Sequence, residues 1–144
     1  MPVAALWTHR KPTARPTRPE LAASEYTAAV TLELFAGVPV RDYARSLAWY
    51  ERLLGSPPTF LATPTEAVWE LAEHRYVYIE ERTGGVGHAL VTIFVDDFDG
   101  QLVSIATRGI EPEQLETYDN GVRKATFGDP DGNQIGFGGG PLEA

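Results

Sequence analysis

The alternation of hydrophobic and polar residues predicts a unit that occurs twice along the chain. A β-rich run at 31–40 is followed by a segment with apolar residues at helical spacing, and Gly55 stands where a helix C-cap glycine belongs. The helical positions are Tyr43, Leu47, Tyr50 and Leu54. Short strand-like runs then follow at about 59–62, 67–71 and 75–81. The first half therefore reads as β-α-β-β-β.

The same pattern restarts after Thr83-Gly84-Gly85. A strand is predicted at 88–95, and the next segment places Phe98, Leu102 and Ile105 on one helical face. Strands are then predicted at about 114–118, 122–127 and 134–138. The first two are joined through Asn120-Gly121, which is typical of a hairpin. The two units correspond at a period of about 55 residues.

A duplicated unit of this kind predicts an α+β fold with two tandem βαβββ modules, at about 31–83 and 86–138. Each module buries its apolar strand face, and the two curved mixed sheets surround a cleft. We expect residues 26–144 to form this single domain. Residues 1–25 carry four prolines and four basic residues, which predicts a flexible basic arm.

Strand parity predicts which side chains line the cleft. One parity is uniformly apolar, as a face packed beneath helices requires: Val38, Val40, Val77, Ile79, Val91, Ile93, Val95, Ile135 and Phe137. The opposite parity is mixed aromatic, small and polar, which suits a flat organic ligand. The predicted ligand-binding residues are Phe35, Trp69, Tyr76, Tyr78, Leu90, Thr92, Phe94 and Gly136. The pattern does not set the parity of Trp69, for which a core position is the alternative.

The amino-acid composition indicates which classes of binding partner this protein can have. The 144 residues include 12 basic and 20 acidic ones, a net charge of −8 that disfavours nucleic-acid binding and suits a neutral or cationic ligand. The absence of cysteine excludes disulfides and thiolate chemistry. No apolar run approaches the roughly 20 residues of a membrane span, and no signal-peptide core is seen. We therefore expect a cytoplasmic protein that binds a small molecule and neither nucleic acid nor membrane.

Two motifs carry a resemblance to a known family. The segment VxDxxxSxxWYxxxLG begins at Val40, and FxDPDGNxIxF begins at Phe127. Over about residues 32–138 the chain resembles the vicinal oxygen chelate superfamily, which includes glyoxalase I, extradiol dioxygenases and bleomycin resistance proteins. The resemblance implies the glyoxalase/bleomycin resistance-like fold. In this family a second copy often completes the cleft, so the resemblance also implies a homodimer.

Enzymes of this family hold a divalent metal ion, and the resemblance places its ligands at Phe35, Leu90 and Gly136, with a further position near Tyr78. These side chains offer essentially no ligation at neutral pH, so we expect no metal cofactor. A displaced set two residues earlier is the alternative: Glu33, His88 and Gln134. Their other interpretation is that they are polar rim residues at strand starts.

The leading hypothesis is a metal-free binding protein, similar to the bleomycin resistance branch. It would sequester an aromatic or cationic compound such as an antibiotic or secondary metabolite. The alternative is an enzyme (a lyase, isomerase or dioxygenase) that uses the displaced metal site or His88 as a base. A third interpretation is an interaction module. His74 is expected in a solvent-exposed turn.

Overall fold

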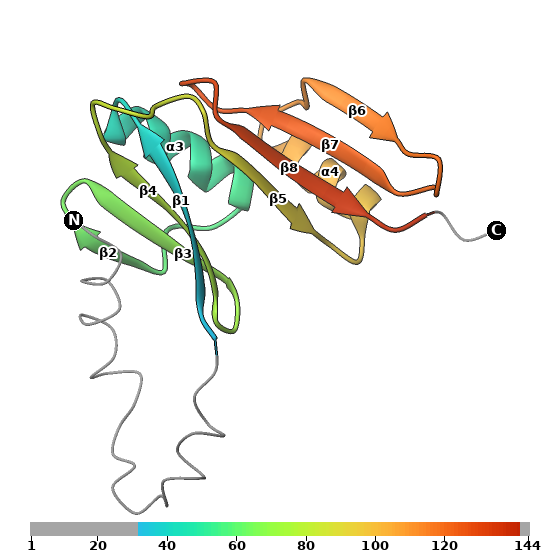
Figure 1. The fold of residues 1–144 in the computed structure, drawn as a ribbon, viewed down its shortest axis with the longest axis horizontal. Helices are drawn as coiled ribbons and strands as arrows, with labels where there is room; N and C mark the ends of the chain where they lie inside the picture. The colour runs from blue at the N-terminus through green and yellow to red at the C-terminus, as the bar shows by residue number, and fades with distance from the viewer. Residues whose placement is uncertain (1–31, 142–144) are drawn as a thin grey trace, which may run out of the picture.

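The computed structural model describes residues 32–141, which form two four-stranded mixed sheets backed by two helices (Figure 1). The N-terminal half contains β1 (Leu34–Val40), α3 (Tyr43–Leu54), β2 (Phe60–Thr63), β3 (Glu66–Ala72) and β4 (Arg75–Glu81). The C-terminal half contains β5 (Leu90–Phe94), α4 (Phe98–Thr107), β6 (Gln114–Thr117), β7 (Arg123–Gly128) and β8 (Gln134–Gly139). The predicted arm at 1–25 lies outside the described residues.

Each half builds one sheet with the same strand order. The N-terminal sheet runs β1-β4-β3-β2, and the C-terminal sheet runs β5-β8-β7-β6. In each, the outermost first strand is parallel to its neighbour and the remaining pairs are antiparallel. This repetition confirms the predicted α+β fold of two tandem βαβββ modules. Within the chain the two sheets do not close onto each other.

Local signals set the ends of the helices. The Asp42 side chain accepts a hydrogen bond from the backbone N–H of Arg45, and Asp97 does the same for Gly100. The first helix ends at Gly55, whose φ of 81° lies in the left-handed region that glycine adopts without strain. The helices therefore lie where the sequence predicts them. Strand β5 is shorter than predicted, and His88 precedes it.

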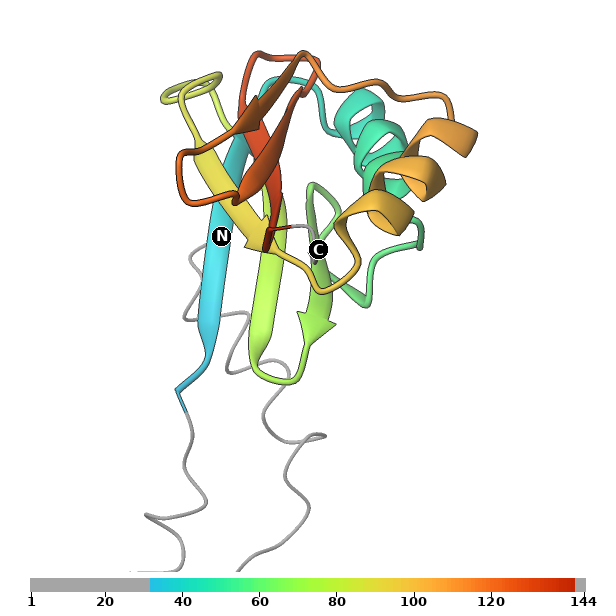
Figure 2. The ribbon, with the colours of Figure 1, turned by 90° about the vertical axis from the view of Figure 1, so that its right-hand side faces the viewer.

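Each sheet has one face toward the helices and one open face. Both helices lie on the same side of the sheets (Figure 2), and they contact each other. The residues of the apolar parity lie on the helix face. All except Val77, which is also buried, lie in or against one continuous core that spans both modules. Its fully buried strand residues include Val38, Val40, Ile79, Ile135 and Phe137. The opposite faces, which we call the open faces, carry the other parity. On the N-terminal sheet this face buries Glu66, Val68 and Tyr76, whereas on the C-terminal sheet Leu90, Thr92 and Phe94 are exposed.

The turn before β8 ties the two modules together through what we call the Asp129–Asn133 clasp. The buried Asp129 carboxylate accepts hydrogen bonds from the Tyr50 hydroxyl and the Asn133 side-chain amide, both at 2.8 Å. Asn133 also donates to the carbonyl of Pro39 at 3.0 Å and accepts from the N–H of Ala89 at 2.9 Å. A turn of the second module is thus bonded to a helix and a strand of the first.

Because of Tyr50, we expect the free energy of unfolding to fall as the pH rises into the alkaline range. Burial raises the pKa of its phenol, and the charge and hydrogen bond of Asp129 raise it further. The unfolded chain releases this proton near pH 10, while the folded chain retains it, so raising the pH favours unfolding. The Tyr50 contribution is therefore complete below about pH 10 and declines above it by up to about 1.4 kcal/mol per pH unit.

Replacing Tyr50 with phenylalanine is expected to flatten this alkaline decline. Urea unfolding of the wild type and Tyr50→Phe at pH 8, 10 and 11 measures it. Tyr43 and Tyr78, whose pKa values burial also raises, should leave a residual pH dependence in both proteins. Identical slopes for the two proteins would contradict the assignment to Tyr50.

Candidate ligand-binding faces

The open face of the N-terminal sheet carries an aromatic wall made of Phe35, Tyr76 and Tyr78. The rings of Phe35 and Tyr76 are stacked, with centroids 4.3 Å apart and planes inclined by 8°. Tyr78 meets Phe35 edge-on at 6.5 Å. The Tyr78 ring lies across Gly37, because a Cβ atom there would come within 2.5 Å of it. The structure therefore brings three predicted site residues together on one face of the sheet, where Phe35 and Tyr78 are half-buried and Tyr76 is buried.

Two carboxylates lie beside this wall. Glu66 on β3 and Glu80 on β4 are paired in the strand register and are both buried. Glu80 also forms an ion pair with Arg82, at 2.9 Å. Burial and the charge of Glu80 raise the pKa of Glu66, and burial together with both carboxylates raises the pKa of Tyr78. Both shifts favour the protonated forms of Glu66 and Tyr78, and the ion pair with Arg82 offsets the charge of Glu80.

A hollow of about 310 Å³ opens next to these groups. It is lined by Gly37, Val38, Pro39, Tyr78, Glu80, Arg82, Gly84 and Gly85. The volume lies at the lower end of the range of about 300–1,000 Å³ that small-molecule sites occupy. A small ligand group in the hollow could therefore contact the Tyr78 ring and the ion pair of Glu80 and Arg82 together.

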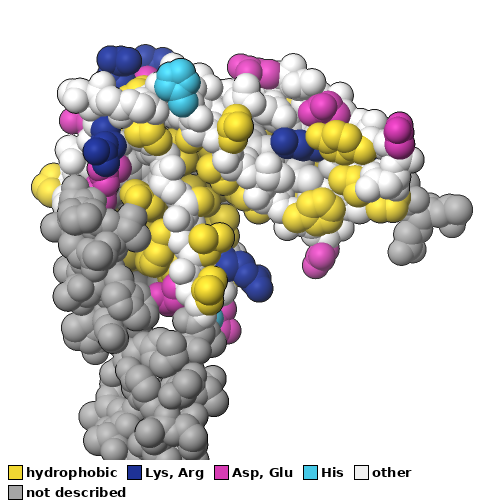
Figure 3. All heavy atoms as spheres, viewed as in Figure 1, with side chains coloured by type: hydrophobic (Ala, Val, Ile, Leu, Met, Phe, Trp, Pro, Cys, Tyr) yellow, Lys and Arg dark blue, Asp and Glu magenta, His cyan; other side chains and the backbone are white. Residues whose placement is uncertain are grey.

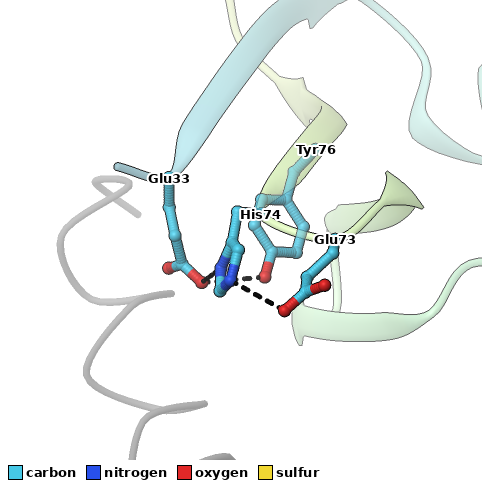
Figure 4. Close-up of polar contacts among 4 residues, drawn as sticks. All are labelled: Glu33, Glu73, His74 and Tyr76. Atoms are coloured by element: carbon cyan, nitrogen blue, oxygen red, sulfur yellow. Dashed lines mark hydrogen bonds and ion pairs between the residues drawn. The ribbon is translucent and has the colours of Figure 1, made fainter. Parts of the chain in front are cut away.

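A polar cluster supports the aromatic wall from below (Figure 4). One oxygen of Glu33 accepts a hydrogen bond from the Tyr76 hydroxyl and lies 3.1 Å from Nδ1 of His74. The other ring nitrogen of His74 lies 3.1 Å from a carboxylate oxygen of Glu73. The expectation that His74 is exposed is wrong, because these contacts hold it half-buried at the β3–β4 turn. The cluster fixes the orientation of Tyr76.

The open face of the C-terminal sheet carries the other predicted wall residues. The exposed fractions of Leu90 and Phe94 are 79% and 63%, and Thr92 between them is also exposed. Gly136 lies beside Thr92 in the strand register. Figure 3 shows hydrophobic side chains gathered over this sheet with a basic side chain among them. The predicted cleft residues thus divide between two sheets that do not close within one chain.

Trp69 does not belong with the wall residues. It is paired with Val77 on the helix face of the N-terminal sheet and is buried in the core, 6.1 Å from the Tyr50 ring. Its indole N–H donates to the carbonyl of Ser56 at 3.0 Å. The interpretation of Trp69 as a core residue, which the sequence left open, therefore holds, and its inclusion among the ligand-binding residues is corrected.

The positions that the family's metal enzymes use do not fit a metal ion here. Phe35, Leu90 and Gly136 provide a ring, an alkyl group and a hydrogen atom, none of which is a ligand. Tyr78 has a raised pKa, so its phenol stays protonated at neutral pH. Within residues 32–141, no three His, Cys, Asp or Glu side chains lie close enough to bind one ion. The absence of a metal cofactor nevertheless stays a prediction.

The structure separates the alternative metal ligands Glu33, His88 and Gln134. Asn133 bonds to both Pro39 and Ala89, which places His88 and Gln134 near the end of β1. Glu33 precedes the start of β1, a strand of seven residues and therefore about 23 Å long. Two of the three alternative ligands thus adjoin each other, and the third lies at the opposite end of β1.

Comparison with known proteins identifies the family. A model of the glyoxalase/bleomycin resistance protein/dioxygenase superfamily matches residues 31–137. The crystal structure of a glyoxalase/bleomycin resistance protein from Catenulispora acidiphila is 52% identical, with a TM-score of 0.75 over 77% of this chain and 100% of that one. The chain therefore belongs to the glyoxalase/bleomycin resistance protein/dioxygenase superfamily.

More distant structures share the fold. TnmS3, an antibiotic binding protein from Streptomyces sp. CB03234, is 22% identical, with a TM-score of 0.59 over 78% of this chain and 98% of that one. A bleomycin resistance determinant encoded on the transposon Tn5 is 19% identical, with a TM-score of 0.63 over 78% and 100%. No curated protein matches the chain. None of the helices in the described part of the chain is long and apolar enough to span a membrane.

Two residues of the open faces were missed by sequence reasoning. Glu66 stands at the start of β3, where the parity of the strand is unclear from the pattern. Lys124 lies on β7, one residue from the start of the strand, and faces the same side as Gly136. A signal in the sequence could have placed Lys124 on the open face. The Asn120-Gly121 turn sets the register of the β6–β7 hairpin, and the parity of β8 then assigns the faces of β7.

Proposed function

We propose that this protein is a metal-free small-molecule binding protein that sequesters an aromatic or cationic compound, such as an antibiotic or secondary metabolite. The observation that carries the proposal is the aromatic wall of Phe35, Tyr76 and Tyr78 beside the buried carboxylates of Glu66 and Glu80. A flat ring can contact the half-buried rings of Phe35 and Tyr78, and a cationic substituent is attracted by ring faces. TnmS3, an antibiotic binding protein, and the bleomycin resistance determinant of Tn5 support it by analogy of fold.

A second copy of the chain is proposed to complete the cleft. On the C-terminal sheet the open face is exposed within one chain, and a ligand held by that face alone would keep much of its surface in water. Leu90 and Phe94 expose large apolar side chains on the C-terminal sheet, which a facing wall would cover. We therefore propose a homodimer. We also propose a cytoplasmic location, on the composition argument given in the sequence analysis.

Two compounds with the same ring test the proposal. At pH 7.5, 9-aminoacridine is a flat cation and acridine is flat and uncharged. Calorimetric titration of the full chain should detect binding of each compound. The affinity for the cation should be at least as high as the affinity for the neutral ring. Tyr78→Ala should weaken both about 5–10-fold, because an aromatic contact is worth about 0.5–1.5 kcal/mol beyond its burial.

Two control variants sharpen this measurement. Leu115→Ala changes an exposed apolar residue of β6 and should leave both affinities unchanged. His88→Ala should do the same, because a stacking site does not need a base. Absence of binding by both compounds would contradict the proposal. Chemical conversion of a bound compound that His88→Ala abolishes would instead favour the enzyme.

A further inference from the structure

Two glycines of β8 allow neighbouring side chains to lie flat on the C-terminal sheet. The Phe94 ring lies across Gly138, since a Cβ atom at that glycine would come within 3.0 Å of ring carbon Cδ1. The Lys124 chain lies across Gly136, where a Cβ atom would come within 2.6 Å of Cε. A ring and an ammonium group are thus presented side by side on the open face.

The ammonium group lies next to a hydroxyl. A Cβ atom on Gly136 would be 3.6 Å from the Lys124 nitrogen and 3.5 Å from the Thr92 hydroxyl oxygen, so both groups border the same small space. An ammonium has three N–H donors, and the hydroxyl can donate as well. One acceptor oxygen placed above Gly136 could therefore be bound by both residues.

Lys124 has no acidic partner in the part of the chain that the structure describes. The ion pairs found there involve His74, Arg82 and Arg123. Glu116 lies opposite Lys124 in the β6–β7 register, yet the lysine leans toward β8 and forms no ion pair with it. The lysine thus keeps its charge on the same face as the exposed ring of Phe94, where a ligand can use it.

We propose that Lys124 and Thr92 bind an ionised oxygen of an aromatic ligand, a carboxylate or phenolate, while the ligand's ring stacks on Phe94. This rests on the proposed function, and it adds the ligand's chemical class and orientation. The N-terminal sheet presents the acidic side chains of Glu66 and Glu80 in the corresponding place, and Arg82 there is already paired with Glu80. The acidic group of the ligand therefore points toward the C-terminal sheet, where a charge-assisted hydrogen bond to the ammonium is stronger than a neutral one.

A matched pair of probes tests this inference with the full chain. Acridine-9-carboxylate has the ring of acridine and a negative charge at pH 7.5. We expect it to bind about 10-fold more tightly than acridine at low ionic strength, with the preference shrinking as salt is added. Lys124→Met should reduce the preference to less than 2-fold without weakening acridine. Arg75→Met, which removes the same charge from an exposed site elsewhere, should keep the preference.

A second variant and a direct readout strengthen the test. Gly136→Ala should also remove the preference, because the added Cβ displaces the lysine chain. The chain has two lysines, Lys11 and Lys124, so reductive methylation with ¹³C-formaldehyde gives few NMR signals, and Lys124→Met identifies the one of interest. Acridine-9-carboxylate should shift this signal, whereas acridine should shift it much less.

The outcomes separate this inference from the proposed function. Binding of acridine and 9-aminoacridine without preference for the acid, or a preference that survives Lys124→Met, overturns the role of Lys124 and leaves the binding function standing. Loss of the oligomer in Lys124→Met, measured by sedimentation, would assign the lysine to a carboxylate of a second copy and also overturn it. Failure of all three compounds to bind and to shift the lysine signal overturns both proposals.

Discussion

Asp129→Ala is expected to lower the free energy of unfolding by about 3–5 kcal/mol, because it removes the centre of the Asp129–Asn133 clasp. The carboxylate accepts four hydrogen bonds at 2.8–2.9 Å, two from side chains and two from the backbone N–H groups of Asp131 and Asn133. Without it, the buried Tyr50 hydroxyl and the Asn133 amide lose a partner, and each orphaned group costs about 1–3 kcal/mol. Urea unfolding at pH 7 measures the loss.

A graded variant and a control accompany this measurement. Tyr50→Phe removes one of the four donors and leaves the other three, so it should cost about 1–2 kcal/mol. Asp96→Ala, an exposed acidic residue in the loop before α4, should change stability by less than about 0.5 kcal/mol. A loss below 1 kcal/mol for Asp129→Ala would show that the two modules hold together without the clasp.

Trp69→Ala should cost about 3–5 kcal/mol, the range for removing a large aromatic side chain from a packed core. The indole is buried among residues of the helix face, and it also loses its hydrogen bond to Ser56. Thermal or urea unfolding measures this cost. The experiment tests whether Trp69 lies on the helix face, away from the aromatic wall.

The contrast with Phe94 makes the result specific. Phe94→Ala removes another large ring, but one that is 63% exposed on the open face, so it should change stability by less than about 0.5 kcal/mol. The binding effects should be reversed: Phe94→Ala weakens acridine binding, and the conservative Trp69→Phe leaves it unchanged. Equal destabilisation by the two alanine variants would refute the division into a core face and an open face.

The sequence predicted the fold well because its signals are local. Asp42 and Gly55 bound a helix through contacts within four residues, and Asn120-Gly121 dictates a tight turn between β6 and β7. The same holds for strands with one buried face, where a period of two separates core from surface. Repetition of the whole pattern then predicts two copies of one module.

Positions that depend on tertiary contacts could not be predicted in this way. Glu66 through Trp69 are all buried, and a strand covered on both faces shows no alternation, so the side of Trp69 was undetermined. His74 adopts a positive φ of 65° in a turn, where nothing in the local sequence indicates its carboxylate partners. The placement of Lys124 depends on Gly136, a glycine on the next strand of the sheet.

The glycines of β8 make the C-terminal face easy to alter by mutation. The shape and charge of the C-terminal face are set by the side chains that fold onto Gly136 and Gly138 from β5 and β7. Adding one methyl group at Gly136 would redirect the only lysine of the described chain, without altering the buried side of the sheet. The shape and charge of this face can therefore change by single-codon substitutions in a strand whose opposite face keeps the core intact.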